Sequence, residues 1–379
     1  MNMPPPGGWP PPQQPGPPPY GESHPQPQFG SQPPSSWQQG NWPQQPTPPP
    51  QKQGGSLKWL LIGVAVLLVV AISVGATLLF TRDDRGAAST PTSGGSSDIA
   101  SANDTKPVSI ITDEPTCASY MPINNSIANV EANGWGAQRS SLGPVSGWTE
   151  EQRTQVQSVA TAMRNAADQV VPLTKQTPHR VVRELYEQFI AYGRAYAQSI
   201  ETYTPADNEI ATANVNAGSA LAGICNAITY GSAARSVALQ PAAEPSNVAQ
   251  PADPRNPDMF VTSASADCVQ WVSRENQFTA ATSDWANLDT GIAGSQWTPE
   301  QRSLQQAAVI QLSDWADFME TEGERSQNSA FQDFALLAAL YIRAYLPLGD
   351  KYIDSDAWLT YTAFRLSNTI SGACSAKVG

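Results

Sequence analysis

Hydrophobic residues recur every three or four positions in three stretches between residues 149 and 227, with polar residues between them. This spacing places the apolar side chains on one helical face and is typical of helices packed on a core. The apolar positions are Val159, Met163, Ala166 and Val170 in the first stretch, Val182, Leu185, Phe189, Tyr192 and Tyr196 in the second, and Ile210, Ala217, Leu221 and Ile224 in the third. The first predicted helix starts after Thr149, because Thr149 and Gln152 have the spacing of a capping box. The second follows Pro178.

The same pattern returns 149 positions later in the chain. Residues 148–227 align with residues 297–376 without a gap, and about seventeen of the eighty pairs are identical. The identical pairs include Trp148 and Trp297, Tyr196 and Tyr345, Gly223 and Gly372, and Cys225 and Cys374. A looser match reaches back to Cys117 and Cys268, and a shorter helix is predicted after each of these cysteines. The last two thirds of the chain are therefore a tandem duplication in which each copy runs from cysteine to cysteine.

The expected fold class is all-α, with two tandem antiparallel bundles of about four helices each. Four antiparallel helices return the chain to its starting end, so the first and last cysteines of each copy should meet there. This predicts the disulfides Cys117–Cys225 and Cys268–Cys374, each stabilising its copy by about 4–5 kcal/mol in the chain-entropy model. The alternatives, Cys117–Cys374 with Cys225–Cys268 or the crossed pairing, are poorer because they ignore the duplication.

The first part of the chain predicts a tail and a membrane anchor. Nineteen prolines fall within the first fifty residues, and such a segment cannot bury enough apolar surface to order itself, so residues 1–56 should be a disordered tail. Residues 57–80 are almost entirely apolar, and a helix of this length crosses a hydrocarbon core of about 30 Å. The remaining boundaries are a flexible stalk at 81–112, repeat 1 at 113–230, a linker at 231–262 and repeat 2 at 263–379.

The orientation of the predicted membrane helix follows from the cysteines rather than from flanking charge. Lys52 and Lys58 lie on the N-terminal side of the predicted helix, and Arg82 and Arg85 lie on its C-terminal side. The two sides carry equal numbers of basic residues, so the positive-inside rule does not decide the orientation. All the cysteines lie after the helix, which suits an oxidising compartment. We therefore expect a single-pass cell-membrane protein with a cytoplasmic tail and extracytoplasmic repeats. The net charge of −12 for the whole chain makes nucleic acid an unsuitable partner.

Sequence motifs for catalysis, metals and cofactors are missing. Histidine occurs only at His24, in the predicted tail, and at His179, next to a helix start, so no histidine pair can bind zinc and no histidine-based triad is indicated. There is no glycine-rich phosphate loop. The cysteines are too far apart for a redox pair and are expected to be structural. We therefore expect a non-enzymatic protein with no cofactor and no metal site.

The most suggestive polar feature is a Tyr-x-Arg-x-Tyr element present in both copies. Its arginines are Arg194 and Arg343, and the preceding helix of each copy carries an identical aspartate, Asp168 or Asp317. A charged side chain on a largely apolar helix needs a partner. We expect structural pairs Arg194–Asp168 and Arg343–Asp317; the alternative is that each arginine faces an anionic ligand or partner.

The order of the parts resembles that of proline-rich single-pass membrane proteins of mycobacteria and related actinobacteria. These parts are the Pro/Gln/Gly-rich tail, one membrane helix, a small polar stalk and an exported domain with paired cysteines. The resemblance covers the whole chain as architecture and implies a cell-envelope location.

Three functions are compatible with this organisation. The first is a non-enzymatic envelope scaffold or adaptor whose duplicated helical module binds a protein partner or envelope component. The second is a ligand-binding or sensing ectodomain for a lipid or small molecule, and the third is an envelope enzyme. An apolar pocket would favour the second, and a carboxylate pair in a cleft would favour the third.

Overall fold

The computed structural model describes residues 99–236, 239–245 and 247–378, and these residues form helices, turns and loops without a β-strand. The predicted tail at 1–56, the predicted membrane span at 57–80 and most of the predicted stalk lie outside these residues. Within them, no helix combines the length and apolar character needed to cross a membrane.

Each repeat is built from three long helices, preceded by a shorter one, as expected from the periodicity. Repeat 1 contains α2 (Cys117–Glu131), α3 (Trp135–Gln138), α4 (Glu150–Gln176), α5 (Arg180–Ser199) and α6 (Asn208–Thr229), followed by α7 (Ser232–Arg235). Repeat 2 contains α8 (Ala266–Ala281), α9 (Ser283–Ala286), α10 (Pro299–Arg325), α11 (Ser329–Tyr345) and α12 (Ala357–Val378). Short 3-10 turns occur at Arg139–Ser141, Val145–Gly147, Ile200–Thr202, Pro205–Asp207, Gly294–Gln296, Gly349–Lys351 and Asp354–Asp356. The three long helices start at positions offset by 149 residues, which confirms the duplication at the level of structure.

The predicted capping boxes start the longest helix of each repeat. The Thr149 hydroxyl accepts from the Gln152 backbone N–H, and the Gln152 side chain accepts from the Thr149 N–H. Thr298 and Gln301 make the same reciprocal bonds. These bonds satisfy backbone donors that a helix start leaves without partners, so α4 and α10 begin at equivalent residues.

Both predicted disulfides are present and join the shorter first helix of each repeat (α2 or α8) to its last long helix (α6 or α12). Cys117 and Cys225 are bonded with their Cα atoms 5.4 Å apart, and Cys268 and Cys374 with their Cα atoms 5.0 Å apart. Neither bridge links the two repeats. Each repeat is thus closed on itself, as the antiparallel arrangement predicted.

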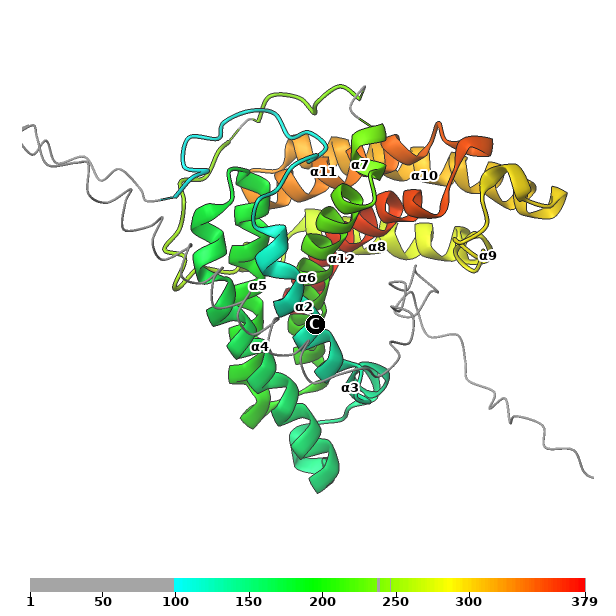
Figure 1. The fold of residues 1–379 in the computed structure, drawn as a ribbon. Helices are drawn as coiled ribbons and strands as arrows, with labels where there is room; N and C mark the ends of the chain where they lie inside the picture. Colours follow the sequence, from blue (N-terminus) through cyan, green and yellow to red (C-terminus); the bar gives the residue numbers. More distant parts are fainter. Residues whose placement is uncertain (1–98, 237–238, 246, 379) are drawn as a thin grey trace, which may run out of the picture. The chain divides into compact units, whose positions relative to one another are not determined.

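The two repeats pack together through their last helices, α6 and α12, which lie against each other (Figure 1). A methyl group added at Gly223 would lie 2.6 Å from the Thr362 hydroxyl, and one added at Gly372 would lie 2.6 Å from the Ala213 backbone nitrogen. Gly372 is the counterpart of Gly223, and Thr362 is the counterpart of Ala213. The contact is therefore reciprocal, like that of a symmetric dimer, and its close helix approach requires glycine.

The segments expected to be a stalk and a linker differ from that expectation where they are described. In the stalk, Val108 and Ile111 are buried, and the Ala100 N–H donates to the Lys175 carbonyl at 2.9 Å. In the linker, the Phe260 ring lies between Tyr192 of repeat 1 and Phe334 of repeat 2, at centroid distances of 6.1 and 5.4 Å. These apolar side chains make residues 99–112 and the end of the linker part of the packed body, because exposing them to water would be unfavourable.

Candidate functional site

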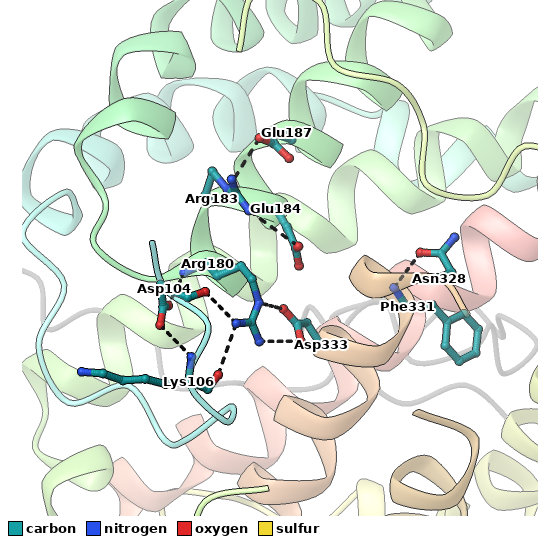
Figure 2. Close-up of polar contacts among 9 residues, drawn as sticks. All are labelled: Asp104, Lys106, Arg180, Arg183, Glu184, Glu187, Asn328, Phe331 and Asp333. Atoms are coloured by element: carbon teal, nitrogen blue, oxygen red, sulfur yellow. Dashed lines mark hydrogen bonds and ion pairs between the residues drawn. The ribbon is translucent and has the colours of Figure 1, made fainter. Parts of the chain in front are cut away.

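A cluster of charged side chains lies between the first turns of α5 and α11, where the two repeats meet. We call it the seam cluster. It consists of Arg180, Arg183, Glu184 and Glu187 on α5, Asp333 on α11, and Asp104 in the segment before α2 (Figure 2). The arginine and glutamate side chains and that of Asp333 are at most 8% exposed. Charged groups at such depth require partners, because burial removes their hydration.

Arg180 connects three parts of the chain. Its Nε and Nη2 donate to the two carboxylate oxygens of Asp333 at 2.6 and 3.0 Å. Its Nη1 donates to the backbone carbonyls of Asp104 and Lys106 at 2.8 and 3.2 Å. Its backbone N–H also donates to Asp104 Oδ2 at 2.7 Å. One guanidinium therefore joins repeat 1, repeat 2 and the segment that follows the predicted membrane span.

Glu184 and Asp333 are equivalent positions of the two repeats, and their carboxyl groups face each other across the seam. Within the described residues, no donor hydrogen-bonds either oxygen of Glu184. Arg183 Nη2 lies 3.8 Å from Glu184 Oε1. Burial raises the pKa of Glu184 well above its usual value, and the neighbouring Asp333 raises it further, whereas Arg183 and Arg180 lower it.

Glu187 lies one turn further along α5. Its Oε1 is 3.7 Å from Arg183 Nε, and burial raises the pKa of Glu187 to about 7, against the lowering effect of Arg183. The carboxyl groups of Glu184, Glu187 and Asp333 are closed to solvent, so a substrate cannot reach them. The seam cluster can hold the repeats together and exchange protons, but it is not a catalytic cleft.

The structure brings together each of the arginines and aspartates that the sequence singled out. Arg194 Nη2 lies 2.6 Å from Asp168 Oδ1, and Arg343 Nη2 lies 2.9 Å from Asp317 Oδ1. Arg343 also contacts Glu320. Both aspartate side chains are 62% exposed. The pairs therefore lie on the outer surface, where each links the first two long helices of its repeat, α4 to α5 and α10 to α11.

An open groove of ≈ 570 Å³ lies between the end of α2 and the start of α4 in repeat 1. It is lined by Asn129, Val130, Asn133, Glu150, Glu151, Thr154, Gln155 and Ser158. Seven of these eight residues are polar, but most of the surface that they present to the groove is made of carbon atoms.

The outer face of α10 differs from that of its counterpart α4. Leu304, Ala307 and Ile310 occupy the positions that Gln155, Ser158 and Thr161 occupy in repeat 1. Ile310 is 61% exposed in the middle of a helix of 27 residues. Repeat 2 therefore presents an apolar stripe where repeat 1 is polar.

Sequence reasoning did not identify the seam cluster. Two features of the sequence could have indicated it. Acidic residues, Glu184 and Asp333, occupy equivalent positions of the two repeats, and two arginines lie near the start of α5, which the structure shows to be buried almost all round. Each feature by itself also fits a solvent-exposed helix start. Among the described residues, no group of three or more His, Cys, Asp or Glu side chains is arranged to hold a metal ion.

Comparison with known proteins finds one matching family and one similar protein. The family described as "Mycobacterial ESX-1 associated protein" matches residues 99–379. An uncharacterized protein of Mycolicibacterium smegmatis (strain MKD8) is 41% identical over 346 aligned residues, and the alignment covers 89% of this chain and 91% of the relative. The aligned part of the chain is longer than residues 99–379, so the similarity to this relative extends into the first 98 residues. No solved structure matches the chain.

These matches confirm the mycobacterial part of the resemblance, whereas its proline-rich single-pass part concerns residues outside the described ones. The family match covers both repeats, the seam cluster and the segment that Arg180 holds. The chain belongs to the family of mycobacterial ESX-1 associated proteins.

Proposed function

We propose that this protein is a non-enzymatic, membrane-anchored accessory protein of the ESX-1 secretion system, whose duplicated helical module binds a protein partner outside the membrane. In this proposal residues 57–80 anchor the chain, the tail lies in the cytoplasm and the repeats act as a scaffold or adaptor. The family match supports the association with ESX-1. The observation that carries partner binding is the apolar stripe on α10.

The comparison of the repeats supports a binding role for this stripe. The helices α4 and α10 are equivalent and pack in the same way within their repeats. The outer face of α4 therefore shows which residues this fold accepts on the outer face of α10. The fold accepts Thr161 where repeat 2 exposes Ile310, and an exposed isoleucine adds nothing to the core. Asp314 follows one turn after Ile310 on the exposed side. The stripe therefore suits an amphipathic helix with an apolar face flanked by lysine or arginine.

Site-specific photo-crosslinking tests this proposal in the full-length protein, produced in a mycobacterium. A photoreactive residue at position 310 should capture one envelope protein, and the crosslinked peptide should have apolar residues at helical spacing next to basic ones. The same residue at position 161 is the matched control and should capture nothing specific.

The substitution Ile310→Thr, which copies repeat 1, should weaken binding of that partner about tenfold or more, because a fully buried isoleucine contributes about 1.5–3 kcal/mol. The melting temperature should stay the same. Equal crosslinking from positions 161 and 310, or capture of only a second copy of this chain, would contradict the proposal.

A second candidate, a ligand-binding ectodomain, is favoured by the open groove of repeat 1. Its ligand would be a small molecule. Ser158→Trp would fill the groove, and Ala307→Trp at the equivalent position of repeat 2 is the control. If native mass spectrometry finds a bound molecule that only Ser158→Trp removes, ligand binding becomes the better description.

A further inference from the structure

We propose that Glu184 is a proton-binding site built into the seam between the repeats, and that its proton keeps the membrane-proximal segment 99–116 docked on the module. This inference concerns the regulation of the module and does not depend on which partner it binds.

The first argument is the charge of the seam cluster. It buries two guanidinium groups, Arg180 and Arg183, and three carboxyl groups, Glu184, Glu187 and Asp333. With every group ionised, the seam would hold an uncompensated negative charge away from water, which is strongly unfavourable. One bound proton restores neutrality.

The second argument identifies the carboxyl group that takes this proton. Asp333 receives two hydrogen bonds from Arg180 and is thereby held as a carboxylate. Among the described residues, Glu187 Oε1 lies 3.7 Å from Arg183 Nε and also lacks a hydrogen bond, but a backbone hydrogen bond at Ala252 lowers the pKa of Glu187, and Glu184 has no such bond. Glu184 receives no hydrogen bond within the described residues, and its carboxyl group interacts with that of Asp333. A protonated Glu184 can donate to Asp333, whereas an ionised Glu184 would repel it.

Glu184 interacts with charged groups of two helices. Arg180 and Arg183 of its own helix lower its pKa, and Asp333 of α11 raises it. Two further carboxyl groups of the seam cluster have other partners, since Glu187 lies beside Arg183 and Asp104 accepts from the Arg180 backbone. Burial is the largest cause that raises the pKa of Glu184, and the two arginines only oppose it.

The third argument links the proton to segment 99–116. Ionised Glu184 would push Asp333 away, and Asp333 positions the Arg180 guanidinium. That guanidinium donates to the carbonyls of Asp104 and Lys106. Loss of the proton therefore weakens the bonds that hold the segment nearest to the predicted membrane span.

The direction of the pH effect follows from the raised pKa. The docked state keeps the proton, and the undocked state, with its carboxyl group in water, releases it above its ordinary pKa. Docking is therefore complete at low pH and is lost as the pH rises. Between the two pKa values each opening releases one proton, so the equilibrium constant for opening should rise about tenfold per pH unit.

Hydrogen exchange measured by mass spectrometry on the full-length protein tests this, after correction for the intrinsic pH dependence of exchange. Protection of residues 99–116 should fall about tenfold per pH unit in the wild type. Glu184→Gln, which keeps the shape of the neutral acid, should keep these residues protected over the whole range. The infrared band of a protonated carboxyl group should also be present in the wild type and decrease in this variant.

Glu275→Gln is the matched control. Burial raises the pKa of Glu275 to about 7, but this carboxylate accepts from Ser367 in repeat 2 and has no bond to segment 99–116. The control should keep the pH dependence of the wild type at residues 99–116. The proposal is overturned if Glu184→Gln keeps it too, if Glu187→Gln alone abolishes it, or if the wild type shows no pH dependence.

Discussion

Replacing Arg180 with methionine tests whether the buried ion pair at the seam holds the module together. The variant keeps much of the side-chain volume but removes the guanidinium that pairs with Asp333 and caps two carbonyls of segment 99–116. The side chains of Arg180 and Asp333 are 2% and 1% exposed. Asp333 would therefore remain as a buried charge without its partner.

The expected loss is about 3–5 kcal/mol in the free energy of unfolding, which is the usual effect of removing one partner of a buried pair. With about 2–4 °C per kcal/mol for domains of 150–250 residues, the melting temperature should fall by about 6–20 °C. Thermal and urea unfolding at neutral pH, followed by circular dichroism, measure both quantities.

Arg194→Met is the matched control, because Arg194 is on the same helix and pairs with Asp168 at the same distance of 2.6 Å as the Arg180 pair. Asp168 is 62% exposed, so this pair should contribute at most about 1 kcal/mol. A double variant, Arg180→Met with Asp333→Leu, should recover much of the stability, since apolar residues can replace a buried ion pair. If Arg180→Met destabilises no more than the control, the reasoning from burial is wrong.

Three further predictions concern the helix contact between repeats, a disulfide and a second buried carboxyl group. Gly372→Ala should lower the free energy of unfolding by about 1–3 kcal/mol, because its methyl would meet the Ala213 backbone at 2.6 Å; a gain of about 1 kcal/mol, as in an unobstructed helix, would contradict the close approach. Replacing Cys117 and Cys225 together with serine should lower it by about 4–5 kcal/mol in urea unfolding, and a loss below about 1 kcal/mol would argue against the bridge. For Glu275, whose pKa burial raises to about 7, stability should fall as the pH rises from about 4.5 to 7, because the folded state keeps a proton that the unfolded state releases. Glu275→Gln should remove this fall, and an unchanged pH profile would show that the carboxyl group titrates normally.

The helices and disulfides of each repeat were predictable because they depend on local and periodic signals. Thr149 and Gln152 are three residues apart in any helix start, so their capping box could be identified without tertiary information. The duplication then identified which cysteines are equivalent and thereby favoured pairing within each copy.

The exposed ion pairs were predictable for the same reason. Arg194 and Asp168 recur as Arg343 and Asp317 with the same separation of 26 residues on neighbouring helices. The apolar sequence around Arg343 also indicated partial enclosure of its side chain, which is 32% exposed and has two acidic partners.

The packing of residues 99–112 could not be predicted from composition. The stretch from residue 81 to 112 is rich in serine, threonine and glycine, which is typical of flexible connections. Val108 and Ile111 belong to a short apolar run within it, and their burial depends on surfaces that exist only once the helices have packed. A short segment of this kind has no periodic pattern from which the surface that it packs on could be predicted.

The sequence by itself determined the internal duplication, the all-helical repeats and the pairing of the cysteines, because periodicity, capping and repetition act over short distances along the chain. Only the tertiary structure decided that α6 and α12 bring the repeats together and that Arg180 joins three segments. Arg180 and Asp333 are 153 residues apart, and their ion pair depends on how two helices from different repeats come into contact. The burial that makes their charges important is a property of that contact and is absent from either helix alone.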